Sequence, residues 1–263
     1  MTPFIPESIK SIIKDKSYTL DEIGMSGSTI LNFEDMVLKI EENTSEAENT
    51  VEMLKWLKGK LPVPEIICYE VHENISYLLM SRIEGEMSCE ECYLEQPDLL
   101  ASLLAEGLKM LWSVDIGDCP CDNMLEHKLE LAQEIIDNDG VDIENTEPGT
   151  FGEGGFESPQ ALLDWLKENK PEEEPVLSHG DYCLPNIFLK DNKVNGFIDL
   201  GRSGISDKWL DIALGYRSLV HNFDGSYGGK VYEDFNPEIL FEKLGIEPEW
   251  DKIRYYILLD ELF

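Results

Sequence analysis

The feature that most constrains the fold of this chain is a pair of polar motifs separated by a short apolar stretch. His179-Gly180-Asp181 is followed five residues after the aspartate by Asn186, and Gly196-Phe197-Ile198-Asp199-Leu200-Gly201 comes next. Asp199 lies 13 residues after Asn186, which is enough for a turn and a β-hairpin that returns to its origin. The spacing therefore predicts that oxygens of Asp181, Asn186 and Asp199 meet in one place. For the first motif alone, a polar turn stabilised by Asp and Asn is the alternative.

These oxygen-bearing side chains suit phosphoryl transfer. A carboxylate can accept the proton of an acceptor hydroxyl or orient it, while an amide oxygen and a second carboxylate ligate Mg²⁺ on a triphosphate. We therefore expect Asp181 to be the catalytic carboxylate and Asn186 and Asp199 to be the magnesium ligands.

A lysine near the N-terminus is a third element of the pattern. Lys39 lies in the predicted strand that ends at Ile40, after a turn of small residues around Gly24-Met25-Ser26-Gly27. Each part alone is weak evidence, because lysines are common in edge strands and this turn is neither a G-x-G-x-x-G nor a G-x-x-x-x-G-K-[ST] loop. Lys39 is a candidate site residue only because the two polar motifs follow it in the same chain.

The charge balance restricts the partners. The 263 residues contain 21 Lys and Arg against 54 Asp and Glu, a net charge of −33. Such a chain repels nucleic acids and anionic membranes and attracts cations, although solubility alone is the simpler explanation. No apolar run reaches the roughly 18 residues of a membrane span, and Met1 to Phe4 does not begin a secretory signal. We expect a cytoplasmic protein without nucleic-acid or membrane partners.

The six cysteines are too few for a disulfide scaffold in a chain of this length. Cys89-x-x-Cys92 and Cys119-Pro120-Cys121 contain four thiols that a zinc ion could use. The second pair is too closely spaced for the usual zinc knuckle, so incidental thiols are the preferred interpretation.

The hydrophobic pattern divides the chain into a β-rich and a helical part, an α+β class. The first part, residues 1–84, contains a short helix at 7–16, several strands, and a longer helix at 46–59 that Pro62 and Pro64 follow. Gly85 follows as a hinge, and residues 85–263 are mainly helical. Strands are expected at 18–22, 36–40, 65–71 and 75–80, with a further β stretch at 186–200. Helices are expected at 97–114, 122–138, 158–169, 206–221, 237–244 and 248–261, and an exposed loop at 139–157.

The two motifs resemble those of the aminoglycoside 3′-phosphotransferases, which are distant relatives of the protein kinases. The resemblance extends to Cys183-Leu184-Pro185 inside the first motif, to the segments 56–64, 197–204 and 207–209, and to the end of the chain at 255–263. Among these enzymes the chain looks most like the type III enzyme. The resemblance implies a bilobal protein-kinase-like fold, with a nucleotide-binding lobe at 1–84 and a lobe at 85–263 that carries the catalytic loop, the magnesium site and an acidic acceptor surface.

The resemblance also implies roles for individual residues. Lys39 would hold the phosphates of ATP or GTP, and Asp211 would steady the catalytic loop. The backbone at Ser81 and Ile83 would meet the adenine edge. The phosphates would be covered by the turn of Ser26, Gly27 and Ser28. An aminoglycoside would be bound through Glu144, Asn145, Arg202, Arg217, Asp260, Glu261 and Phe263, with Glu147 joining them.

Three positions depart from the family pattern. The helix glutamate that pairs with the strand lysine would fall at Thr50, so that Glu46, Glu48 or Glu52 would have to replace it. Val37 stands where the type III enzyme stacks a tyrosine on adenine, and Leu184 stands where it has an acid. These departures predict altered nucleotide affinity and a narrower acceptor range.

The expected activity is ATP- and magnesium-dependent transfer of a phosphoryl group to a hydroxyl of kanamycin-type aminoglycosides, which confers antibiotic resistance. Asp260 and Glu261 would stand at the C-terminal end of the last helix, where negative charge opposes the helix dipole and a bound polyamine would offset the cost. Arg202 and Arg217 would be their counter-charges. The alternative hypothesis is a small-molecule kinase that acts on choline or a sugar, and a third hypothesis is a pseudokinase. The acting unit would be a monomer or a dimer.

Overall fold

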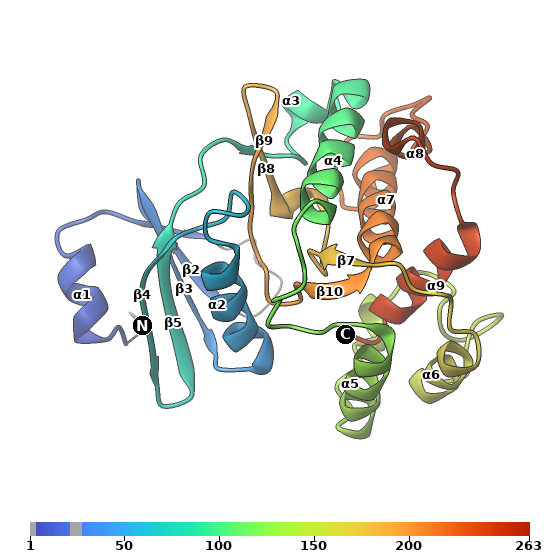
Figure 1. The fold of residues 1–263 in the computed structure, drawn as a ribbon, viewed down its shortest axis with the longest axis horizontal. Helices are drawn as coiled ribbons and strands as arrows, with labels where there is room; N and C mark the ends of the chain where they lie inside the picture. The colour runs from blue at the N-terminus through green and yellow to red at the C-terminus, as the bar shows by residue number, and fades with distance from the viewer. Residues whose placement is uncertain (1–3, 22–27) are drawn as a thin grey trace.

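The computed structural model describes residues 4–21 and 28–263, so the turn residues Ser26 and Gly27 lie outside the described part. A β-sheet near the N-terminus lies beside a larger, mainly helical part, as the expected α+β class requires (Figure 1).

The N-terminal part is an antiparallel sheet accompanied by two helices. Its strands follow the order β1-β2-β3-β5-β4. In β3 the burial alternates, so that Met36, Leu38 and Ile40 face the core while Lys39 lies on the opposite face. The elements are α1 (Glu7–Ile13), β1 (Thr19–Asp21), β2 (Thr29–Asn32), β3 (Met36–Glu42), α2 (Ser45–Leu57), β4 (Ile66–His72) and β5 (Ile75–Ser81).

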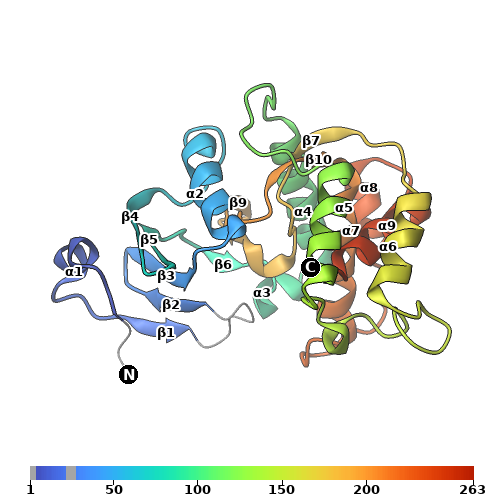
Figure 2. The same ribbon diagram turned by 90° about the horizontal axis from the view of Figure 1, so that it is seen from below.

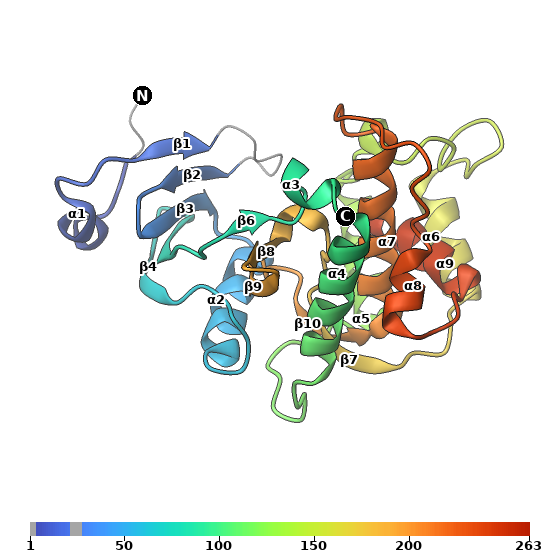
Figure 3. The ribbon, with the colours of Figure 1, turned by 90° about the horizontal axis from the view of Figure 1, so that it is seen from above.

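The C-terminal part is built around α4 and α7, with α8 against α4 and α9 against α7 (Figures 2 and 3). Short strands connect these helices to the sheet. The elements are β6 (Glu86–Met87), α3 (Glu91–Leu94), α4 (Pro97–Trp112), α5 (Leu125–Asp137), η1 (Ile143–Asn145), α6 (Pro159–Glu168), β7 (Pro175–Ser178), η2 (Leu184–Asn186), β8 (Ile187–Lys190), β9 (Lys193–Phe197), β10 (Gly204–Asp207), α7 (Lys208–Asp224), α8 (Ile239–Leu244) and α9 (Trp250–Asp260).

Helix α2 connects the two parts. Thr44 caps its N-terminus by accepting a hydrogen bond from the Ala47 amide at 3.3 Å. Its buried residues Val51, Leu54 and Leu57 belong to the same apolar core as α4 and α7. A second, smaller core lies beneath the sheet and α1 and includes Ile9, Leu31, Phe33, Leu38 and Leu79. The helix is therefore packed against the C-terminal part as well as the sheet.

The expected long elements all form, with boundaries that differ by a few residues. The short strands β6, β7 and β10 and the helix α3 were not expected, because two to four residues show no periodic pattern. Across the described residues, no helix combines the length and apolar character needed to cross a bilayer.

Candidate active site

The hairpin of β8 and β9 brings the three predicted oxygens together. Its register pairs Ile187 with Phe197, and the Ile198 amide donates to the Asn186 carbonyl at 3.0 Å. The Asn186 amide nitrogen donates to the Asp181 carboxylate at 2.9 Å and to its carbonyl at 3.0 Å. Asp199 therefore directly follows Ile198, which is the backbone hydrogen-bond partner of Asn186. The Asp181 carboxylate lies against the side-chain amide of Asn186.

A buried carboxylate fixes the backbone before Asp181. Asp211 is fully buried and accepts hydrogen bonds from the Ser178 hydroxyl at 2.9 Å, the His179 amide at 2.7 Å and the Gly180 amide at 3.0 Å. Burial raises the pKa of Asp211, while its electrostatic interaction with His179 and these hydrogen bonds oppose the rise. Gly180 has φ +83°, and a Cβ there would lie 1.9 Å from the Arg202 carbonyl oxygen. Only glycine fits this turn.

The other side of the loop is anchored in the helical core. Tyr182 is fully buried and donates to the Leu104 carbonyl at 2.7 Å, and the Leu184 amide donates to the Ser218 hydroxyl at 3.0 Å. Helices α4 and α7 thus hold the residues on either side of Cys183. Leu184, which stands where the type III enzyme has an acid, is fully buried.

Lys39 contacts Asp199 and a glutamate of its own strand. Its Nζ lies 3.2 Å from Asp199 Oδ1 and 3.0 Å from Glu41 Oε2. Burial lowers the pKa of Lys39, but the two carboxylates outweigh burial and the net pKa is raised. Two of the three helix glutamates are engaged elsewhere, with Glu46 3.0 Å from Arg202 Nε and Glu48 accepting from Asn43 at 2.9 Å. Glu52 forms no ion pair with Lys39 among the described residues. The partner of Lys39 therefore comes from β3, two residues further on the same face.

Asp199 adopts a backbone conformation that is uncommon for a residue with a side chain. Its φ is +59° and its side chain is 47% exposed. Strain of this kind concentrates at sites where a ligand needs a particular orientation. Asn186 Oδ1 accepts no hydrogen bond from any described residue. One carboxylate and one free amide oxygen at this place fit the ligand preference of Mg²⁺.

A cleft of about 470 Å³ lies between the sheet and the C-terminal part, and Lys39 and Asp199 both line it. The Ile83 amide donates no hydrogen bond within the described residues, whereas the Ser81 amide already donates to the Glu65 carbonyl at 2.8 Å. Because Glu65 just before β4 occupies this amide, a contact between the Ser81 backbone and the base would have to use the Ser81 carbonyl. The cleft is lined, among others, by Ser28, Val37, Met80, Ser81, Ile83, Phe188 and Ile198.

The end of the chain meets the two expected arginines beside this cleft. Arg217 contacts Asp260 and lies 3.1 Å from Glu261, and Arg202 lies 3.4 Å from Asp260. The ring of Phe263 lies 5.7 Å from the Arg202 guanidinium. Arg202 and Arg217 are therefore the counter-charges of the two terminal carboxylates, at the positions where the sequence led us to expect them.

The substrate-loop residues are only partly brought to this cluster. Glu147 lies 3.9 Å from Arg217 and 3.4 Å from His221, and its amide donates to Glu261 at 2.7 Å. Glu144 and Asn145 lie in the exposed η1, where Asn145 donates to Asp142 at 2.6 Å. Neither contacts the arginines in the described structure.

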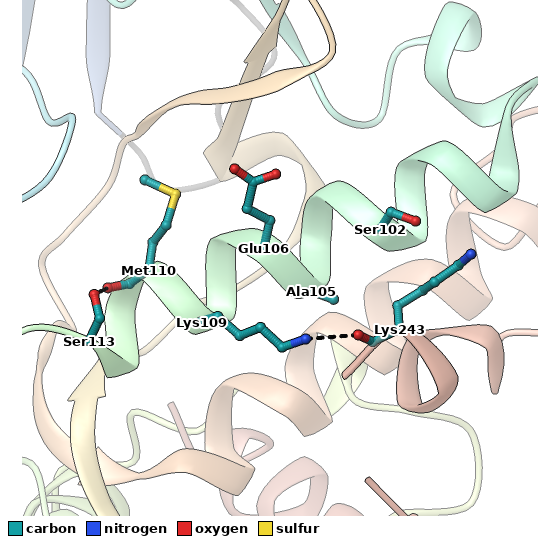
Figure 4. Close-up of a pocket in the computed structure, with 7 residues that line it drawn as sticks. All are labelled: Ser102, Ala105, Glu106, Lys109, Met110, Ser113 and Lys243. Atoms are coloured by element: carbon teal, nitrogen blue, oxygen red, sulfur yellow. Dashed lines mark hydrogen bonds between the residues drawn. The ribbon is translucent and has the colours of Figure 1, made fainter. Parts of the chain in front are cut away.

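A second hollow, of about 380 Å³, lies on the surface between α4 and α8 (Figure 4). Lys109 donates to the Lys243 carbonyl at 2.9 Å, and Lys243 pairs with Asp98 at 2.6 Å. Both ammonium groups are thus occupied. Among the described residues, no group of three or more His, Cys, Asp or Glu side chains is arranged to hold a metal ion.

The sequence patterns did not identify several residues of the site. Glu41 belongs to the strand of Lys39 and could have been found from the i, i+2 rule for strands. Asn49, which donates to the carbonyls of Gly201 at 2.8 Å and Ser203 at 2.9 Å, carries no local signal because its partners are 152 and 154 residues away.

Comparisons with known proteins agree with this geometry. The phosphotransferase enzyme family model matches residues 27–254. An aminoglycoside 3′-phosphotransferase from Enterococcus faecalis is 42% identical, and one from Staphylococcus aureus is 41% identical, each over 98% of both chains. An aminoglycoside phosphotransferase APH(3′′)-Id structure from Streptomyces rimosus has a TM-score of 0.80 at 22% identity and covers 97% of this chain and 95% of its own. That protein has also been solved with ADP and streptomycin. The chain therefore belongs to the aminoglycoside 3′-phosphotransferases of the phosphotransferase enzyme family.

Proposed function

We propose that this chain transfers the γ-phosphoryl group of ATP to the 3′-hydroxyl of kanamycin-type aminoglycosides. The observation that carries the proposal is the joint placement of Asp181, Asn186 and Asp199 at one end of the β8–β9 hairpin, next to Lys39. Residues 1–84 act as the nucleotide-binding lobe and residues 85–263 as the lobe that binds the acceptor.

The nucleotide side of the proposal rests on the cleft. Lys39 supplies a positive charge to the phosphates, and the free Ile83 amide is a donor for the base. Asn186 and Asp199 are the side chains that would hold magnesium, which when bound neutralises charge on the phosphates. ATP is the expected donor, and GTP is a competing one that the cleft residues do not exclude.

The acceptor side rests on charge and position. Asp181 orients the acceptor hydroxyl and accepts its proton as the phosphoryl group is transferred. The carboxylates of Glu147, Asp260 and Glu261 lie around Arg217 and attract the ammonium groups of an aminoglycoside. The arginines hold these carboxylates in place, so binding does not require them to be ordered first.

Asp181→Ala tests the mechanism. We expect magnesium-dependent ATP turnover that requires kanamycin, and we expect the variant to lose at least about a thousandfold in kcat. Its melting temperature and ADP affinity should stay close to those of the wild type, because the Asn186 amide keeps its hydrogen bond to the carbonyl of residue 181. Asp191→Ala, in the hairpin turn, is the matched control. Undiminished turnover in Asp181→Ala would reject the mechanism, and turnover with choline but not kanamycin would reject the acceptor.

A further inference from the structure

The loop that follows α7 places an aromatic ring beside the acceptor site. Gly225 ends the helix with φ +83°, and the next residues form a tight turn. The Ser226 amide donates to Asp224 at 2.8 Å, and the Gly228 amide donates to the Gly225 carbonyl at 2.9 Å. These bonds hold the residue between them, Tyr227, at the tip of the turn.

Tyr227 is 61% exposed, which makes it one of the most exposed large hydrophobic side chains of the described structure. Its ring lies 5.1 Å from the ring of His221, at an interplanar angle of 85°. His221 Nε2 in turn lies 3.4 Å from Glu147 Oε1. A chain of contacts thus leads from the exposed tyrosine to the carboxylate next to Arg217.

The hydroxyl end of Tyr227 shares its surroundings with the reacting groups. Burial raises the pKa of this hydroxyl, Arg217 opposes the rise, and the nearby Cys183, Glu147 and Asp181 add to it. Tyr227 therefore lies within electrostatic range of Arg217 and Asp181, and its ring contacts His221. An aromatic ring that leaves most of its surface open to solvent beside an acidic site has a surface to offer a ligand.

We propose that Tyr227, backed by His221, is the outer wall of the acceptor site and binds an amino-sugar ring of the acceptor through its aromatic ring. This inference rests on the proposed function and adds a specificity-determining residue to it. A sugar presents C–H groups that pack on an aromatic surface, and its ammonium substituents are attracted by the π-system. The carboxylates around Arg217 attract the ammonium groups of the acceptor, and the ring of Tyr227 offers a flat apolar surface for a sugar ring.

The test compares three variants in steady-state assays with kanamycin A and magnesium ATP. Tyr227→Ala is expected to raise the KM for kanamycin about five- to tenfold and to change kcat less than twofold. Tyr227→Phe keeps the ring and should stay within twofold of the wild type. Val231→Ala, an exposed residue of the same loop, is the control and should change neither constant.

Calorimetry with kanamycin in the absence of nucleotide should show the same ordering of affinities, and ADP affinity should be equal in all four proteins. A wild-type chain that does not phosphorylate kanamycin overturns the proposed function. An active wild type with an unchanged KM in Tyr227→Ala overturns the role of Tyr227 alone, as does an equal rise in KM in Val231→Ala, because a general disturbance of the loop would then explain it.

Discussion

Lys128 in α5 carries an ammonium group in the protein interior. The residue is 8% exposed, and its Nζ makes no hydrogen bond or ion pair with any described residue. The nearest aromatic contact is the Phe263 ring, whose centroid lies 5.5 Å from Nζ. Burial lowers the pKa of Lys128 to about 8, Arg202 acts in the same direction, and the carboxylates of Asp260 and Asp211 oppose it. A charge that is buried without a partner destabilises the folded state.

Lys128→Met should therefore stabilise the protein, by on the order of 1–3 kcal/mol at pH 7, because methionine keeps the length of the side chain and removes the charge. The folded-state pKa of about 8 lies below the ordinary value of 10.5, so the unfolded state binds more protons between these pH values. The free energy of unfolding of the wild type therefore increases as the pH rises through this window. The difference in stability between Lys128→Met and the wild type should shrink accordingly.

Urea unfolding at pH 7, 8, 9 and 10 measures this difference, and Lys14→Met, at an exposed position, provides the control. A Lys128→Met protein that is less stable than the wild type at pH 7 would contradict the interpretation, since it would show that the ammonium group is stabilised where it lies.

At the level of elements, α2 holds the segment that follows Asp199. Asn49 donates to the carbonyls of Gly201 and Ser203, and Glu46 forms an ion pair with Arg202 in the same segment. The ion pair is partly exposed and contributes little. The two amide hydrogen bonds are half-buried, so their loss leaves two carbonyls without these donors. Asn49 is thus the stronger of the two contacts.

Asn49→Ala is expected to lower the free energy of unfolding by about 1–3 kcal/mol and to raise the KM for magnesium ATP several-fold, because Asp199 is then less well positioned. Glu52→Gln, an exposed position on the same helix, should change neither quantity. Urea unfolding and steady-state kinetics measure the two effects. Loss of stability with an unchanged KM for ATP would show that α2 supports the fold without orienting Asp199.

The elements also show what the sequence could predict. The β8–β9 hairpin follows from the spacing of Asn186 and Asp199, because a return over 13 residues allows few other structures. The pairing of β7 with β10 could not be predicted, since four-residue strands lack a pattern and meet through contacts far apart in sequence. The partner of Lys39 is a different case: it was sought on a helix by family resemblance, although the i, i+2 periodicity of strands already pointed to Glu41, which the structure supplies from the same strand.

For the whole molecule, the net charge of −33 should act on the acceptor before contact. A cationic aminoglycoside is attracted over a distance set by the screening length, which falls from roughly 20 Å at 20 mM salt to roughly 6 Å at 300 mM. Association is then slower, and the KM for kanamycin should rise about three- to tenfold over this range. Magnesium ATP is anionic and is repelled by the same field, so its KM should stay level or fall.

The opposite salt responses of the two substrates distinguish the field of the molecule from a general loss of activity. Steady-state assays in 20 and 300 mM KCl, at saturating concentration of the other substrate, measure both constants, and sucrose at matched osmolality is the control for crowding and water activity. If the KM values of kanamycin and ATP rise together, salt acts on the fold or on magnesium binding. A KM for kanamycin that is independent of salt would mean that the contacts around Arg217 act at short range and that the remaining acidic surface serves only solubility.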